Sequence, residues 1–112
     1  MARKRSQPDT VTVDQPDRDT LALHGALTFA TAAYALAEGG RALAAGAQTR
    51  LDLDGLTRAD SAGLACVLAL AAAANRAGRR LRVRHWPEGL RALAAVCDVT
   101  DLLDPPAAAT AR

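Results

Sequence analysis

The short run Asp60-Ser61-Ala62-Gly63-Leu64 combines the residue types in this chain that are best suited to chemistry. It stands between a segment that alternates like a strand and an apolar segment with helical periodicity. The first turn of a helix carries unpaired amides and a partial positive charge, so Asp60 or Ser61 can cap it. The same setting stabilises a phosphate on the hydroxyl of Ser61. From spacing alone, a helix cap with no further function stays the alternative.

A serine also acts as a nucleophile where a histidine and a carboxylate activate it. Ser61, His85 and Asp54 supply these residue types, but both histidines fall in expected strands far along the chain. The sequence has no G-x-S-x-G, Walker A, GxGxxG or H-E-x-x-H motif. A chain of 112 residues also leaves little room for a substrate pocket. We therefore expect no catalytic residues and no enzyme.

The two cysteines, Cys66 and Cys97, form neither a CxxC pair nor a Cys–His cluster with the spacing of zinc ligands. The sequence therefore predicts no metal site and no cofactor. Because half of the residues are apolar, we expect both cysteines to be small buried side chains rather than a disulfide.

Length and composition indicate one domain with a modest core. Aromatic residues make up only 3% of the chain and its net charge is +2, which speaks against a platform for nucleic acid. Charge is nevertheless uneven, with six arginines against one glutamate over 76–91 and three aspartates over 98–104. The basic and the acidic segment could attract a protein partner of complementary charge. The alternative is that they are only the solvated faces of a strand and a helix.

No segment predicts a membrane span or a secretion signal. The longest uncharged run, 61–75, has fifteen residues and as a helix reaches about 22 Å, short of a hydrocarbon core of ~30 Å. The N-terminal stretch 1–10 contains Arg3-Lys4-Arg5 and no apolar region. We expect a cytoplasmic protein.

Alternating apolar residues predict four strands, and the first two form a hairpin around a turn over 15–19. Leucine and valine at alternate positions should face inward, with Asp52, Asp54, Arg82 and Arg84 outward. The expected strands are 10–14, 20–25, 50–56 and 79–85. With the intervening helices the order is β β α β α β α. This is an α/β fold with a four-stranded mixed sheet and helices mainly on one face.

Three helices connect or follow these strands. The first begins near Phe29, capped by Thr28, and ends at Gly46. Its expected buried face consists of Phe29, Ala33, Leu36, Ala37, Gly40 and Leu43. After a loop over 57–59, the second helix runs to Ala77 and buries Leu64, Val67, Leu68 and Ala71. The third begins at Pro87 and buries Leu90, Leu93, Ala94 and Cys97.

Taken together, these segments resemble the STAS domain family, which includes the antagonists of anti-sigma factors. The strand 51–56 leads into a junction that resembles the family's D-S-x-G-L pattern at Asp60–Leu64. Gly25-Ala26-Leu27-Thr28 resembles the G-x-L entry to the first helix. Leu81–Val83, Pro87–Leu93 and Asp98–Leu103 resemble the last strand, the last helix and the close of the domain. Each motif is short, but their order and spacing together are specific.

The resemblance implies a binding role without catalysis, centred on Asp60, Ser61, Ala62, Gly63 and Leu64. In antagonists, the serine at this junction accepts phosphate from a partner kinase, which is an anti-sigma factor, and phosphorylation releases that partner. Ser61 occupies this position. In a second branch, the STAS subunit of the Mla phospholipid ABC transporter, which serves outer-membrane lipid asymmetry, binds the transporter's ATPase subunit.

Two features favour the transporter branch. The chain reaches Pro105-Pro106 without the further C-terminal helix usual in antagonists, and 25–29 lacks their Leu-Asp. We therefore expect a cytoplasmic subunit that binds an ABC ATPase and lies at the inner membrane through it. A phosphorylation-switched antagonist is the alternative. The domain is expected to span 10–104, between a disordered lead over 1–9 and a flexible tail over 105–112.

Overall fold

The computed structural model describes residues 9–99 of the chain. Most of the expected lead and all of the expected tail lie outside these residues, as do Leu102 and Leu103. The described part contains four strands and three helices, which are β1 Val11–Asp17, β2 Thr20–Leu27, α1 Ala32–Ala45, β3 Arg50–Ala59, α2 Ser61–Arg76, β4 Arg82–Arg84 and α3 Glu88–Val96.

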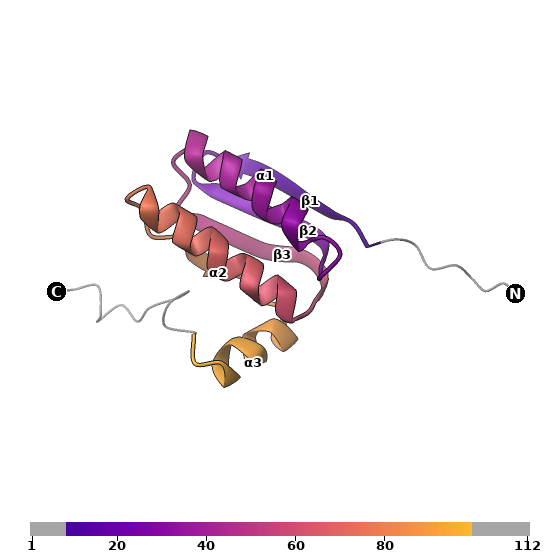
Figure 1. The fold of residues 1–112 in the computed structure, drawn as a ribbon. Helices are drawn as coiled ribbons and strands as arrows, with labels where there is room; N and C mark the ends of the chain where they lie inside the picture. The colour runs from indigo at the N-terminus through magenta and orange to yellow at the C-terminus, as the bar shows by residue number, and fades with distance from the viewer. Residues whose placement is uncertain (1–8, 100–112) are drawn as a thin grey trace, which may run out of the picture.

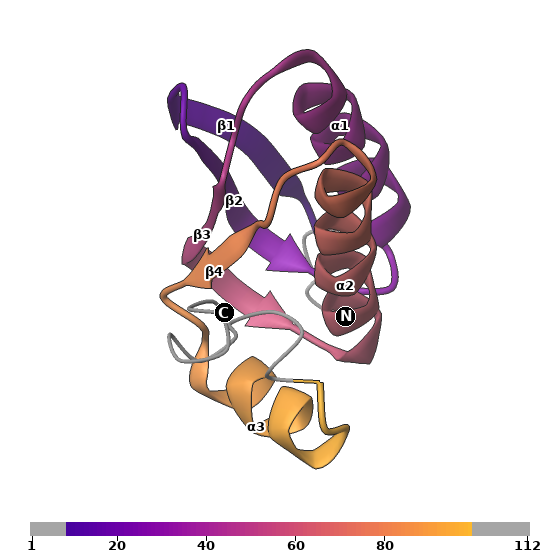
Figure 2. The ribbon, with the colours of Figure 1, turned by 90° about the vertical axis from the view of Figure 1, so that its left-hand side faces the viewer.

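The four strands form one mixed sheet in the spatial order β1-β2-β3-β4. The hairpin pair β1 and β2 is antiparallel, whereas β2 with β3 and β3 with β4 are parallel. Helices α1 and α2 lie side by side over one face of this sheet (Figure 1). Helix α3 lies at the end of the sheet, below α2 (Figure 2). The element order and the fold class predicted from the sequence are confirmed.

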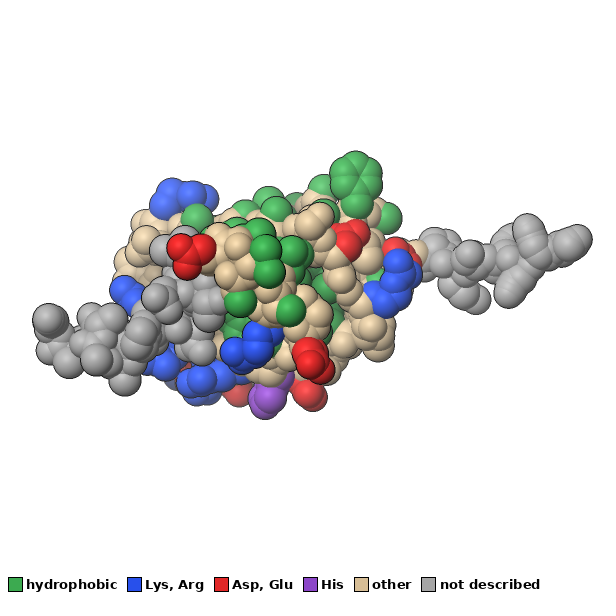
Figure 3. Space-filling view, turned by 90° about the horizontal axis from the view of Figure 1, so that it is seen from below, with side chains coloured by type: hydrophobic (Ala, Val, Ile, Leu, Met, Phe, Trp, Pro, Cys, Tyr) green, Lys and Arg blue, Asp and Glu red, His purple; other side chains and the backbone are tan. Residues whose placement is uncertain are grey.

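The core lies between the sheet and the two covering helices. The inward side chains of β2, β3 and β4 are almost fully buried, namely Leu21, Leu23, Leu51, Leu53 and Val83. The opposite face of the sheet is charged and largely open to solvent. Figure 3 shows this division, with charged side chains and histidine gathered along its lower edge and hydrophobic side chains across its middle and upper edge.

The first helix departs from the prediction in its start and in its buried face. It begins at Ala32, because the carbonyl of Thr28 accepts from the amides of Thr31 and Ala32 and closes a turn before the helix. Its buried residues are Ala35, Gly39 and Leu43. Of the predicted face only Leu43 is buried, and Phe29 is 88% exposed. The predicted buried face was therefore wrong, because the face of α1 that packs against the sheet is the one with Ala35, Gly39 and Leu43.

Three strands are longer than expected, β2 by its extension to Leu27, and the fourth is shorter, because β4 covers only Arg82–Arg84 of the predicted 79–85. Strand β1 continues through Pro16 to Asp17, so the turn shrinks to 18–19. A proline fits there because β1 is an edge strand and needs no amide donor on its outer side. Strand β3 extends to Ala59, so the loop expected over 57–59 was wrong. Pairing with β2 as far as Leu27 opposite Ala59 keeps these residues extended.

The second and third helices match the prediction more closely. In α2, Leu64 and Val67 are buried as expected, but Leu68 and Ala71 are only half-buried, and Leu70 and Ala74 face the core instead. In α3 the buried residues are Leu90 and Ala94, while Leu93 is half-buried. Both cysteines are free thiols; Cys66 is buried, but Cys97 is exposed. The expectation of burial at Cys97 was wrong, because it follows the end of α3.

Candidate functional site

The start of α2 is organised by the carboxylate of Asp60. Its Oδ1 accepts hydrogen bonds from the amides of Ala62 at 2.9 Å and Gly63 at 3.1 Å. Its Oδ2 accepts from the amide of Phe29 at 3.1 Å, in the neighbouring connection between β2 and α1. The amide of Phe29 is the largest cause of a lowered pKa at Asp60, and those of Gly63 and Ala62 add to it against some desolvation. Asp60 is therefore an ionised cap that ties two junctions together.

Ser61 is the first residue of α2 and is exposed to solvent. Ala62 beside it is half-buried, so two small side chains lie at the end of the helix. The positive end of the α2 dipole lies here, which favours a negative group on or near the serine hydroxyl. The structure thus places Ser61 where a partner can reach it.

Gly63 and Leu64 are buried and pack the first turn of α2 against the sheet. A Cβ atom on Gly63 would lie 2.5 Å from the carbonyl oxygen of Leu27, so only glycine lets α2 approach the end of β2 this closely. Leu64 is 4% exposed and belongs to the core. Of the five predicted site residues, Asp60 and Ser61 are thus exposed, Ala62 is half-buried beside them, and Gly63 and Leu64 are buried beneath them.

A shallow cavity of about 290 Å³ adjoins Asp60. It lies between the end of β3 and the first turn of α3, and its walls include Thr28, Thr57, Arg58, Asp60, Pro87 and Leu90. Arg58 is bound at 2.6 Å to Asp9, which also accepts from Thr28 at 2.9 Å. Sequence reasoning missed Arg58 and Phe29 here, because no local pattern shows that three separate segments meet at this end of the sheet.

The structure does not bring together Ser61, His85 and Asp54, the three residues considered above as a serine nucleophile with its histidine and carboxylate. His85 Nδ1 lies 2.9 Å from Asp52 Oδ1, and Asp52 pairs with Arg84 near the beginning of β3. Ser61 follows the opposite end of that strand. Within residues 9–99, no group of three or more His, Cys, Asp and Glu side chains is arranged to hold a metal ion.

The arginine-rich segment has two different functions in the structure. Arg79 is structural, because its guanidinium donates to the backbone carbonyl of Gln48 at 2.7 Å and also to that of Leu43. Arg82 and Arg84 lie on β4, and Arg84 is exposed. The steering of a protein partner by this basic segment stays a prediction.

Asp52 lies close to these arginines. Burial raises the pKa of its carboxyl group, but the hydrogen bonds from the Asp54 amide and from His85 lower it by more, so the pKa of Asp52 is lowered.

Comparison with known proteins points to one family. The family model described as "Mlab, STAS domain" matches residues 11–104. A solved structure of the anti-sigma factor antagonist SpoIIAA in its unphosphorylated form matches with a TM-score of 0.66 and 17% identity, covering 90% of this chain and 92% of that one. The phosphorylated form of SpoIIAA, a Bacillus cell fate determinant, matches with a TM-score of 0.62 and 17% identity, covering 90% and 96%.

A comparison with curated protein sequences finds no match. At 17% identity, the two SpoIIAA structures establish a shared fold. Among the helices of residues 9–99, none combines the length and the apolar character needed to cross a bilayer.

Proposed function

The chain belongs to the STAS domain family, and from this premise we propose that it is a binding protein without catalysis that docks its partner on the N-terminal end of α2. One observation carries the proposal: exposed Ser61 stands at a helix end that Asp60 fixes to the neighbouring junction. A preorganised surface of this kind loses little conformational entropy when a partner binds. The small side chains of Ser61 and Ala62 allow the partner's backbone to approach closely.

The first candidate partner is the ATPase subunit of a Mla-type ABC transporter for phospholipid. The description of the matching family model favours it. In this function the domain supports the ATPase and is held in the cytoplasm at the inner membrane through that contact. Ser61 would then lie in a packed interface and need no modification.

The second candidate partner is an anti-sigma factor kinase that phosphorylates Ser61. It is favoured by the fold shared with SpoIIAA, which is known in phosphorylated and unphosphorylated forms. A phosphate adds roughly −1.5 to −2 charges at neutral pH. On Ser61 it would adjoin the ionised carboxylate of Asp60, and the cost of removing both negative groups from water would expel a partner packed against them. Phosphorylation would then switch binding off.

Substitution of Ser61 tests the shared proposal. We expect Ser61→Asp to weaken binding of the purified partner, ATPase subunit or kinase, by at least about tenfold, or about 1.4 kcal/mol, without lowering the melting temperature. Ser61→Ala is the matched control and should retain binding, because it keeps a small side chain and adds no charge. Binding titrations by calorimetry measure both variants. Undiminished binding by Ser61→Asp to the partner that binds the wild type would refute docking at this end of α2.

Phosphate transfer separates the two partners. The purified chain is incubated with the anti-sigma kinase and ATP, and its intact mass is measured beside Ser61→Ala. Gain of one phosphate by the wild type alone supports the antagonist. Absence of phosphate, together with copurification of the ABC ATPase, supports the transporter subunit.

A further inference from the structure

Helix α1 has two apolar stripes, and the sheet covers only one of them. The stripe predicted to be buried carries Phe29, which is 88% exposed, and Leu36, which is 37% exposed. Ala33 and Ala37 of the same stripe are exposed as well. An ordinary helix on a two-layer domain shows charged residues on this side. Here α1 has only Glu38 and Arg41, and they pair with each other at 2.7 Å.

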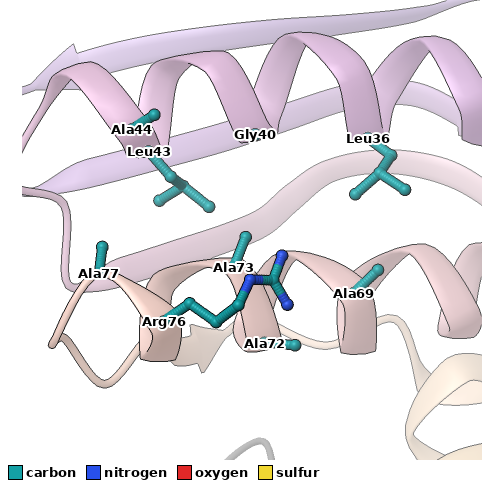
Figure 4. A pocket seen from close by; sticks show the side chains of 9 residues that line it. All are labelled: Leu36, Gly40, Leu43, Ala44, Ala69, Ala72, Ala73, Arg76 and Ala77. Carbon is teal, nitrogen blue, oxygen red and sulfur yellow. The ribbon is translucent and has the colours of Figure 1, made fainter.

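Helix α2 continues this apolar surface. It carries no charged residue before Arg76, and its outer side presents alanines to solvent. Between the two helices runs an open groove of about 620 Å³. Figure 4 shows its walls, with Leu36, Gly40 and Leu43 on α1 facing Ala69 and Ala73 on α2, and the Arg76 side chain extending along α2 beside them.

The helix layer thus has an exposed aromatic ring at one end and a hollow between its helices. Phe29 precedes α1 at the end of the layer where both helices begin. The groove lies toward the end where they finish, at Leu43 and Arg76. A two-fold axis in the plane between two facing layers, at right angles to the helices, would place the Phe29 end of each copy over the groove end of the other. An isologous interface needs this self-complementarity of one surface.

Charge and size agree with a second copy as the occupant. Among residues 9–99, Arg76 is the only charged residue that lines the groove, and an aromatic ring over a guanidinium is a favourable contact. Two helices of 14 and 16 residues present a layer of roughly 450 Å² in projection, from about 1.5 Å of rise per residue and about 10 Å of width each. Two such layers would bury about 900 Å² in total, below the ~1,200 Å² of stable specific interfaces and in the range of transient ones, so the association should be weak and depend on concentration.

We propose that the chain forms a homodimer in which the α1–α2 layers of two copies pack face to face, with Phe29 of each copy in the groove of the other. The Phe29 end of this contact adjoins the partner site proposed for Ser61, because the Phe29 amide donates to Asp60, whereas the groove lies toward the other end of the helices. Its closest competitors for the same surface are a helix of another protein and an amphiphile.

Sedimentation equilibrium from low micromolar to millimolar concentration tests this dimer. We expect the mass to rise from 11.6 kDa toward twice that value. Gly40→Arg should raise the dissociation constant by about tenfold or more, because a long cation fills the groove. A Cβ on Gly40 meets no atom within 4 Å, so the variant should stay folded. Phe29→Ser should weaken the dimer similarly.

Gly89→Arg is the matched control, because its Cβ also meets nothing within 4 Å and it lies on α3, outside the layer. It should dimerise like the wild type. A monomer at every concentration would overturn the proposal, and so would a dimer that Gly40→Arg leaves unchanged. Binding of the Ser61 partner is measured on Gly40→Arg separately, so failure of the dimer is distinguishable from failure of the partner site.

Discussion

The two junctions from strand to covering helix lie side by side, yet they are built in different ways. Between β3 and α2 the chain passes directly through Asp60. Between β2 and α1 it makes a turn over 28–31 before the helix begins. One hydrogen bond, from the Phe29 amide to Asp60, joins them. The comparison shows that a compact junction presents a serine at a helix end, whereas a longer one exposes an aromatic ring.

The means of support differ as well. The junction of α2 depends on one exposed carboxylate and on close backbone contact at Gly63. The junction of α1 depends on buried hydroxyls. Thr31 Oγ1 donates to the carbonyl of Ala26 at 2.7 Å and accepts from the amide of Thr28 at 2.9 Å. Close backbone packing at Gly63 should therefore contribute most to the stability of the β3–α2 junction. The hydrogen bonds of Thr31 should contribute most to the stability of the β2–α1 junction.

Gly63→Ala should have the largest effect on stability. The added Cβ would lie 2.5 Å from a backbone oxygen, so α2 must shift away from β2. We expect a loss of about 1–3 kcal/mol of unfolding free energy, as for other overpacked sites. Urea denaturation measures it. Gly40→Ala is the control, because it has open space and should gain up to about 1 kcal/mol from helix propensity. Equal stability of Gly63→Ala and wild type would contradict the close contact.

Thr31→Val should have an intermediate effect and should break the other junction. The substitution keeps the shape but leaves the carbonyl of Ala26 and the amide of Thr28 without their hydroxyl partner. Unpaired groups at this buried position should cost about 1–2 kcal/mol of unfolding free energy. Amide hydrogen exchange should show faster opening at the start of α1 and not at the start of α2. Faster exchange at both would mean that the two junctions open together.

Asp60→Asn should have the smallest effect, a few degrees in melting temperature at neutral pH, and should show the coupling between the junctions. The pKa of Asp60 lies below its ordinary value of 3.8, so its stabilisation is complete above that value. It is lost as the pH falls through the lower pKa of the folded state. Wild type and variant should therefore differ at pH 7 and converge below pH 3.8. A constant difference across this range, measured by thermal melts, would exclude the ionised cap.

The predictable part of this protein is the part that rests on local patterns. Alternation identified Leu21, Leu23, Leu51 and Leu53 as inward residues, and all are buried. Local signals also predicted a helix start at this junction with Asp60 or Ser61 as its cap, and the cap is Asp60. These features were predictable because a capping side chain bonds to amides two or three residues away.

The start of α1 was not predictable in this way. Thr28 has the residue type of a cap, but its hydroxyl donates to Asp9, nineteen positions earlier in the chain. The apolar spacing around Phe29 and Leu36 is helical, but it does not say which side of the helix meets the sheet. Gly39 decides that, because a Cβ there would lie 2.8 Å from Leu70 of α2.

The order of strands and helices, the fold class and the position of Ser61 at the start of a helix all follow from the amino-acid sequence. Each of these depends on periodicity or on contacts between near neighbours. Three other features follow from the packing of the folded chain: Asp60 also binds the Phe29 amide, Arg58 lies beside the site, and one apolar stripe of α1 faces outward. These features depend on packing between segments that are distant in the sequence. A helix can have more than one apolar face, and the fit of side-chain shapes determines which face packs in the core.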